Sequence, residues 1–398
     1  QVPAETIISK AQQINANAIG LSALLVSTSK QMPLIVNELQ RRGLDIPVLV
    51  GGAAINRRFG WRMLYTAAGE IFQPGVFYCK DAFEGLAVMD RLINPETREE
   101  LLVNLQHSAQ QEQDRPDKVR QKGSGQRSKV SPHPIHLPLG VSWGSRVVWQ
   151  MPLELVFKHL SKKELFRLSW GAKNAHGEEW EQLQHEFEAR LQRMQRDALR
   201  DTWLKPQGIY GYWPVQAQGD EIIVYDPTTI TGQPQELTRL SFPRQPGGEH
   251  LCIADYFAGP ESGVMDVLPL QVVTVGAQAT AYFDQLQMDD DYSEGYFVHG
   301  LAVQTAEAAA DYLHYHILRE LGLADGQGKR YSWGYPAVPQ LEDHRVVFNL
   351  LPAEGELCIS LTEAYQLVPE QSTAALIVHH PQAKYFSVGE SRVEQLSG

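Results

Sequence analysis

The sequence predicts two folds in one chain: a partial doubly wound parallel α/β sheet at the N-terminal end, then an α+β domain with long helices and a mainly antiparallel sheet. Three observations support this. Short apolar runs alternate with helical patterns over residues 1–105. A polar stretch covers residues 106–137, and from residue 138 long helical patterns mix with separate strand patterns. Strands alternating with helices are typical of α/β folds, whereas segregated elements are typical of α+β folds.

The elements of the first domain follow from the spacing of apolar residues. Helices are predicted at residues 7–14, 34–39 and 81–92. Strands are predicted at residues 18–25, 46–50 and 75–79. Gly43 follows two arginines and is predicted to end the second helix, because glycine is the preferred residue just beyond a helix C-terminus. Continuous apolar strands separated by helices indicate a parallel sheet covered by helices.

A polar segment divides the chain. Residues 106–137 are rich in Gln, Ser, Lys, Arg and Pro and almost lack large apolar side chains. Such a segment cannot bury enough surface to offset the entropy lost on ordering, so a flexible linker is predicted between domains 1–105 and 138–398. In the second domain, long helices are predicted at residues 178–203 and 293–323, and strands at residues 221–225 and 267–275.

Composition excludes several classes of protein. The chain has 398 residues, enough for two domains, and a formal charge of −12, which argues against a nucleic-acid partner. No apolar run approaches the roughly 18 residues of a membrane helix, so a soluble protein without a membrane partner is expected. The 3 cysteines are widely separated, which favours reduced thiols in the cytoplasm over disulfides or a zinc site.

The most informative segment begins at Arg330 and continues through Gly334 and Tyr335, with Tyr385 further along the chain. A guanidinium binds a carboxylate with two parallel hydrogen bonds, and a tyrosine face shelters a soft cation at about 0.5 to 2 kcal/mol. These groups suit a zwitterion such as S-adenosylmethionine. The alternative is an exposed arginine before an ordinary Gly-Tyr-Pro turn.

The sequence Arg-x-x-x-Gly-Tyr-Pro at residues 330–336 resembles the S-adenosylmethionine-binding motif of the activation domain of cobalamin-dependent methionine synthase. Further segments resemble the same family in the same order: Gly211-Tyr212-Trp213-Pro214, residues 252–257, Ala306-Glu307-Ala308, Leu361-Thr362-Glu363 and residues 380–385. The resemblance therefore spans nearly the whole chain.

The resemblance implies roles for individual residues of the second domain. Arg330 would hold the methionine carboxylate, Gly334, Tyr335 and Tyr385 would line the pocket, and Glu307 would lie nearby on the long helix. Ser161 stands where the family often has an aspartate. A serine caps a helix and accepts a hydrogen bond, but it cannot neutralise an amino group.

Residues 20–24 and 51–53 are similar to the cobalamin-binding domain of the same family. By that resemblance Ser22, Thr28, Gly51, Gly52 and Ala53 surround the nucleotide tail of the corrinoid; the alternative is two ordinary turns between strands and helices. Ligands of parallel sheets do bind at the carboxyl ends of strands.

The family's Asp-x-His-x-x-Gly, whose histidine binds cobalt, does not occur in the sequence. It is expected upstream of Val2, so the chain is predicted to be a fragment that carries the later part of a cobalamin domain. The lost first strand would leave an unpaired sheet edge.

The resemblance implies the C-terminal part of a methionine synthase, the 5-methyltetrahydrofolate–homocysteine methyltransferase. Such a part binds S-adenosylmethionine to reactivate oxidised cob(II)alamin by reductive methylation. Cobalamin (as methylcobalamin) and S-adenosylmethionine are the implied cofactors. The implied partners are a flavodoxin-like electron donor and the missing homocysteine, folate and cobalamin modules.

Two alternatives remain open: a non-catalytic S-adenosylmethionine-binding or docking module of a split or degenerate methionine synthase, and a structural fragment without a ligand site. No catalytic side chain or metal site is predicted. Asp289, Asp290 and Asp291 precede a helix and are interpreted as caps, and His314 and His316 point to different faces of a helix.

Overall fold

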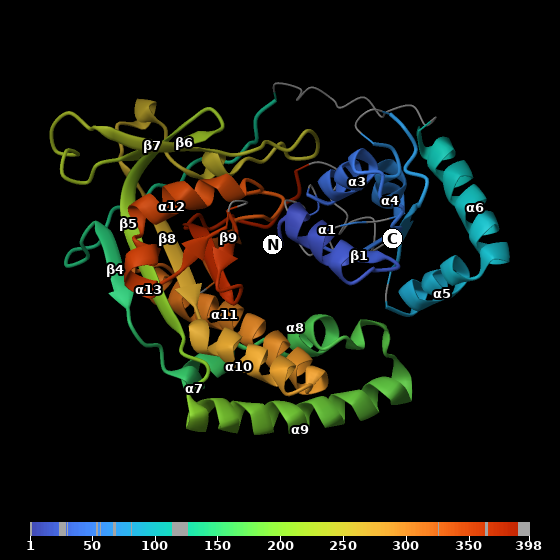
Figure 1. The fold of residues 1–398 in the computed structure, drawn as a ribbon. Coiled ribbons are helices and arrows are strands. Elements are labelled where there is room, and N and C mark those ends of the chain that lie inside the picture. The colour runs from blue at the N-terminus through green and yellow to red at the C-terminus, as the bar shows by residue number, and fades with distance from the viewer. Residues whose placement is uncertain are drawn as a thin grey trace. The chain divides into compact units, whose positions relative to one another are not determined.

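The computed structural model describes residues 2–388 except 24–28, 30, 53–54, 56, 67–68, 81, 114–125, 325 and 363–364. Backbone contacts divide the chain into two compact units (Figure 1). The N-terminal unit contains residues 1–125, 334–340 and 387–398. The C-terminal unit contains residues 126–333 and 341–386.

The N-terminal unit contains a three-stranded parallel sheet in the order β1-β2-β3. Its strands are β1 (Ile19–Ser22), β2 (Val48–Gly51) and β3 (Val76–Tyr78). Its helices, blue to cyan in Figure 1, are α1 (Ala4–Gln13), α3 (Met32–Arg41), α4 (Arg57–Met63), α5 (Ala82–Ile93) and α6 (Pro95–Gln113). The predicted α/β class is confirmed.

Apolar positions at helical and strand spacing form the core of this unit. Ile8 and Leu39 from helices pack with Val48 and Val76 from strands, and all four are buried. Gly43 has a φ of +64° beyond the end of α3, as the arginine-glycine sequence predicts.

The predicted flexible linker differs from the structure at both ends. Helix α6 continues to Gln113, and its Ala109 is buried although a single small side chain gives no strong apolar signal. At the other end, Ser128 Oγ donates to Asp255 Oδ2 at 2.8 Å, and the Ile135 N–H donates to Asp266 Oδ1 at 3.1 Å. Carboxylates distant in sequence fix this polar stretch, which composition does not reveal.

The C-terminal unit is built on a seven-stranded sheet in the order β7-β6-β5-β8-β12-β9, with β4 beside β5. Its strands are β4 (Gly144–Val148), β5 (Gln207–Gln218), β6 (Glu221–Tyr225), β7 (Glu236–Ser241), β8 (Asp266–Thr274), β9 (Lys329–Ser332) and β12 (Ser372–Val378). These strands pair antiparallel, which confirms the predicted sheet. Strands β10 (Ser360–Leu361) and β11 (Leu367–Val368) form a separate pair.

Long helices accompany this sheet, as predicted. They are α9 (Gly177–Asp201), α10 (Ala277–Met288) and α11 (Tyr292–Glu320), with the shorter α7 (Leu153–Val156), α8 (Lys162–Glu164), α12 (His344–Leu350) and α13 (Ala353–Leu357). Helix α11, orange in Figure 1, packs its Leu313 and Ile317 with Val273 of β8 and Ile377 of β12. Within the described residues, no helix has the length and apolarity to cross a membrane.

The acidic run before α11 acts as a cap, as predicted. Asp291 is the N-cap residue, and its Oδ1 accepts a hydrogen bond from the Glu294 N–H at 3.1 Å. This contact satisfies one of the free N–H groups at the helix start and places a negative charge where the helix dipole favours it. The same helix then carries the acidic residues of the candidate site.

Candidate functional site

Strand β9 and helix α11 bring one arginine against two carboxylates. Arg330 lies on β9, opposite Ile377 of β12. Its Nη2 donates to Glu307 Oε2 at 2.6 Å, and its Nε donates to Asp311 Oδ1 at 3.2 Å. Glu307 and Asp311 are four residues apart on α11, so their side chains share one face of that helix. The structure therefore places Arg330 in an ion cluster rather than in bulk solvent.

The cluster keeps capacity for a ligand. The Arg330 side chain is 12% exposed, but those of Glu307 and Asp311 are 36% and 44% exposed. A guanidinium has five N–H groups. In the described chain Nε, Nη1 and Nη2 donate to Asp311, Ser332 Oγ and Glu307, and Nη2 also lies 3.1 Å from Asp311 Oδ1. The second N–H of Nη1 remains for a further acceptor.

Charge and burial act together on this cluster. Burial disfavours the charged guanidinium of Arg330, but the Glu307 and Asp311 charges outweigh it and raise the Arg330 pKa above its ordinary value. Burial also raises the pKa of the Asp311 carboxyl; the Arg330 charge opposes this shift and the Glu307 charge adds to it. One cation between two carboxylates gives the cluster a net negative charge when all three are ionised.

Two tyrosines lie beside the cluster. Tyr331 follows Arg330 on β9 and is buried, and its hydroxyl donates to the Lys384 carbonyl at 2.7 Å. The Tyr385 ring meets the Tyr331 ring edge to face, with centroids 5.5 Å apart, and Tyr385 is 69% exposed. Desolvation raises the pKa of the Tyr385 hydroxyl, the Arg330 charge opposes it, and the Asp311 and Glu307 charges add to it. The predicted residues Arg330, Glu307 and Tyr385 are therefore neighbours.

Residues 168–398 match the family described as "Vitamin B12 dependent methionine synthase, activation domain". The chain belongs to this family. It is also similar to methionine synthases of Mycobacterium tuberculosis, at 32% identity over 436 residues, and Mycobacterium leprae, at 30% identity over 435 residues. Each alignment covers 97% of this chain and 36% of the relative, so the chain spans about a third of the length of these relatives.

Among solved structures, the chain is similar to a crystal structure of the MetH reactivation domain bound to AdoHcy. The TM-score is 0.57 at 24% identity, and the match covers 67% of this chain and 87% of that one. This likeness shows the fold. The predicted resemblance to the activation domain of methionine synthase is thus confirmed.

In this activation-domain chain Ser161 serves as a helix cap. It precedes α8, and its Oγ accepts a hydrogen bond from the Glu164 N–H at 3.3 Å. The capping that the sequence predicts is present. Contact of Ser161 with a ligand stays a prediction.

The Gly-Tyr-Pro part of the activation-domain motif forms a tight turn directly after β9. Gly334 has a φ of +91°, which favours glycine, and its N–H donates to the Val338 carbonyl at 2.8 Å. Tyr335 is 54% exposed. Backbone contacts group residues 334–340 with the N-terminal unit, so the two parts of the motif fall in different units. Roles of Gly334 and Tyr335 in a ligand site stay predictions.

Asp311 was missed by the sequence analysis. Its signal is its spacing of four residues from Glu307 within a long predicted helix, which places both carboxylates on one face. That signal alone does not identify their partner, because β9 lies beyond the helix in the sequence.

The predicted cobalamin residues lie at the carboxyl ends of β1 and β2. Ser22 and Gly51 are register partners there, and Ser22 is exposed. A Cβ atom at Gly52 would lie 2.4 Å from the Ala23 carbonyl oxygen, and Gly52 has a φ of +103°. The chain's own backbone therefore uses the space beside Gly52. Thr28 and Ala53 lie outside the described residues.

The two histidines of α11 lie in different surroundings. His314 is buried, and burial lowers its pKa to about 4. His316 Nε2 lies 3.1 Å from the Tyr210 hydroxyl. Within the described residues, no group of three or more His, Cys, Asp or Glu side chains could hold a metal ion.

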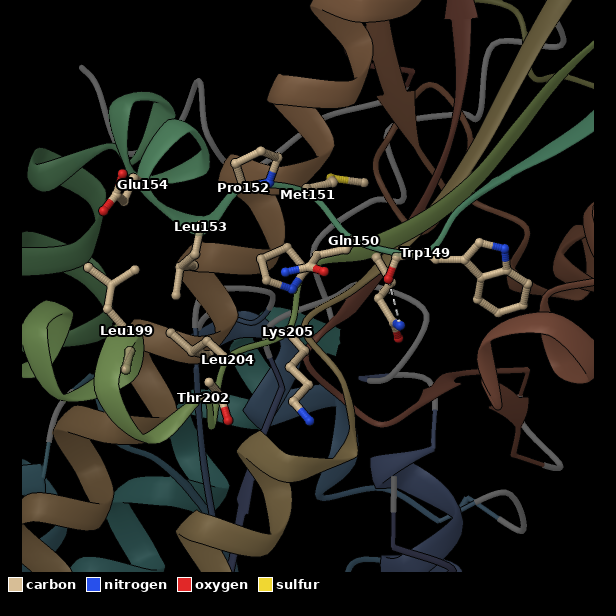
Figure 2. Close-up of a pocket in the computed structure, with 13 residues that line it drawn as sticks. Trp149, Gln150, Met151, Pro152, Leu153, Glu154, Leu199, Thr202, Leu204 and Lys205 are labelled. Atoms are coloured by element: carbon tan, nitrogen blue, oxygen red, sulfur yellow. Dashed lines mark hydrogen bonds between the residues drawn. The ribbon is translucent and has the colours of Figure 1, made fainter.

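A groove of about 480 Å³ occurs elsewhere in the C-terminal unit (Figure 2). Figure 2 shows Leu153, Leu199 and Leu204 gathered on one side of it, and Glu154 and Lys205 also line it. None of the predicted ligand residues lines this groove. Its mainly apolar wall does not suit the charged end of an amino acid.

Proposed function

We propose that the C-terminal unit binds S-adenosylmethionine and uses it in the reductive methylation that reactivates oxidised cob(II)alamin in a cobalamin-dependent methionine synthase. The observation that carries the proposal is the cluster of Arg330, Glu307 and Asp311 in a chain of the activation-domain family. The similar solved structure, which contains AdoHcy, adds support.

The cluster complements both charges of an amino acid. The second N–H of Arg330 Nη1 suits a carboxylate oxygen, and the exposed sides of Glu307 and Asp311 suit an ammonium group. The acidic pair supplies a negative charge, which a serine such as Ser161 cannot supply.

The net charges match as well. One arginine and two carboxylates sum to −1, and S-adenosylmethionine carries +1 because its sulfonium and ammonium charges exceed its carboxylate charge. A complex of the two is neutral. Unlike charges at a few ångströms attract more strongly as the site loses water, so this match favours the sulfonium ligand over its neutral thioether product.

In the proposed reaction the protein positions the ligands, and the cofactors carry the chemistry. When bound, cobalamin would supply the nucleophilic cobalt after receiving one electron from a flavodoxin-like donor. Arg330, Glu307 and Asp311 fix the methionine end, while Tyr385 lines the remainder. A fixed ligand reacts faster because its translational and rotational freedom is already lost.

Contact with cobalamin itself is proposed for Ser22, Thr28, Gly51, Gly52 and Ala53. The exposed Ser22 hydroxyl fits a ligand, whereas Gly52 is already required by the packing of the chain. We further propose that the chain acts in the cytoplasm with the homocysteine, folate and cobalamin modules of a longer or split enzyme, because it spans 36% of its relatives.

Calorimetric titration of the whole chain with S-adenosylmethionine tests the proposal. Arg330→Ala should weaken binding by about 1.5 to 3 kcal/mol, or roughly 10- to 150-fold, because a charge-assisted hydrogen bond is lost. Arg330→Lys should fall between this variant and the parent, because lysine keeps the charge without the fork.

Arg196→Ala is the matched control, since Arg196 is an exposed arginine on another helix, α9. It should bind as the parent does. A parent chain that does not bind, or an Arg330→Ala variant that binds equally well, would refute the proposal.

A second candidate is a non-catalytic S-adenosylmethionine-binding or docking module. The capping role of Ser161 favours it, because the hydroxyl stands where the family often has an aspartate. Binding of S-adenosylmethionine without methyl transfer to reduced cobalamin, with the other modules of the enzyme added, would decide for this candidate.

A further inference from the structure

An aromatic residue continues the acidic face of α11. Tyr315 follows Asp311 by four residues, as Asp311 follows Glu307, so the three side chains lie in one row along the helix. Each step of four residues advances about 6 Å along the helix axis. Tyr315 is 47% exposed, so part of its surface is accessible to a ligand. The row therefore has a charged end and an aromatic end.

His159 supports the Tyr315 ring. It belongs to a short 3₁₀ helix (Phe157–His159), and its ring centroid lies 5.3 Å from that of Tyr315 at an angle of 33°. It also meets the Tyr312 ring edge to face at 5.9 Å. His159 therefore packs against two successive aromatic side chains of α11, which restricts the Tyr315 ring while half of Tyr315 stays exposed.

Residues along the row act electrostatically on Tyr385. Desolvation raises the pKa of its hydroxyl, and the charges of Asp311, Glu307 and Tyr315 add to this shift while Arg330 opposes it. The two exposed tyrosines thus belong to the same electrostatic neighbourhood as the ion cluster.

We propose that Tyr315, supported by His159, is the residue on which the adenine base of S-adenosylmethionine stacks. The inference rests on the proposed function, because it assumes that the methionine end occupies the Arg330, Glu307 and Asp311 cluster. In the ligand the ribose and sulfonium separate the amino-acid end from the base, as one helical turn separates Asp311 from Tyr315. A planar base stacks on an exposed tyrosine face without any need for a charge.

A tyrosine face can also shelter a sulfonium, and the two roles predict different ligand dependence. S-adenosylhomocysteine has the same base but no positive sulfur. Stacking on the base predicts that loss of Tyr315 weakens both ligands by the same factor. Contact with the sulfonium predicts a loss for S-adenosylmethionine alone.

Titration of the whole chain with both ligands tests the inference. Tyr315→Ala should weaken both by about 5- to 100-fold, the range expected for one lost base–aromatic stack. Tyr315→Phe should bind like the parent, because the ring is kept. Tyr315→Leu should behave like Tyr315→Ala and keeps more of the side-chain volume, so it replaces the alanine variant if that one unfolds. Tyr292→Ala, at another exposed tyrosine of α11, is the control.

Three results would each overturn the inference. Tyr315→Ala could bind both ligands as tightly as the parent does, Tyr315→Leu could do the same, or the loss of affinity could be confined to S-adenosylmethionine. The proposed function fails differently, through a parent chain that binds neither ligand or an Arg330→Ala variant that binds as the parent does. If Arg330→Ala weakens binding while Tyr315→Ala does not, the inference alone fails.

Discussion

The two predicted ligand regions differ in how much of each motif folding itself requires. At the carboxyl ends of β1 and β2, the missing side chain of Gly52 makes room for the Ala23 backbone. On α11 and β9, Arg330 is paired, but its two carboxylate partners keep 36% and 44% of their side-chain surface exposed. Packing thus explains the glycine at position 52, whereas it does not explain an excess of exposed negative charge around a buried cation.

The energetics of burial sharpen this difference. A buried charge is costly unless it is paired, so one carboxylate would suffice to stabilise Arg330. The second carboxylate adds negative charge that repels the first, as the raised pKa of Asp311 reflects after the larger effect of its burial. The second carboxylate adds little to the stability of the fold, whereas it strengthens the binding of a positively charged ligand.

The largest expected effect concerns Gly52. Gly52→Ala should destabilise the N-terminal unit by about 3 kcal/mol, because the new Cβ atom overlaps the Ala23 backbone and an L-residue is strained at positive φ. Hydrogen exchange of peptides from β1 and β2 measures this. Gly20→Ala is the control, since nothing lies within 4 Å of a Cβ atom at that position. Equal protection in both variants would contradict the packing role of Gly52.

A smaller effect is expected from the acidic pair. The double variant Glu307→Gln with Asp311→Asn should weaken S-adenosylmethionine binding by about 2 kcal/mol, because both partners of the ammonium group lose their charge. Calorimetry checks this, with the exposed Asp284→Asn of α10 as control. Unchanged affinity in the double variant would mean that the exposed charge of the acidic pair, like Gly52 of the other region, serves folding rather than ligand binding.

The smallest effect is a dependence on pH. Burial raises the Asp311 pKa, so on acidification this carboxyl gains a proton at a higher pH than an ordinary aspartate does. In the proposed complex the ionised carboxylate binds the ammonium group. Affinity for S-adenosylmethionine should therefore be highest above the raised pKa and should fall, by roughly fivefold, as pH drops through it.

Arg330, Glu307 and His159 are the charged or titratable neighbours that act on this group. Asp311→Asn should flatten the affinity profile, whereas His159→Ala should keep it. A profile that persists in Asp311→Asn would assign the titration to another residue.

Most helices and strands could be predicted from the local spacing of apolar residues. Strand β6 (Glu221–Tyr225) coincides with its predicted range, and α9 and α11 differ from theirs by a few residues at the ends. Helix α6 was not predicted, because its exposed polar side chains look like a linker and only a few apolar contacts hold it.

The candidate site was predictable only in part. Arg330, Glu307 and Tyr385 were found by resemblance, and the structure brings them together. Asp311 joins these residues because β9 pairs with β12 and α11 packs on the sheet. Both contacts connect distant parts of the chain. No local pattern encodes such a register.

A crystal structure of the chain with S-adenosylmethionine tests the central claim most directly. The account predicts the ligand carboxylate within about 3 Å of the terminal nitrogens of Arg330, with the ammonium group against Glu307 and Asp311. A ligand bound elsewhere, such as in the apolar groove of Figure 2, with Arg330 contacting only its own carboxylates, would contradict it.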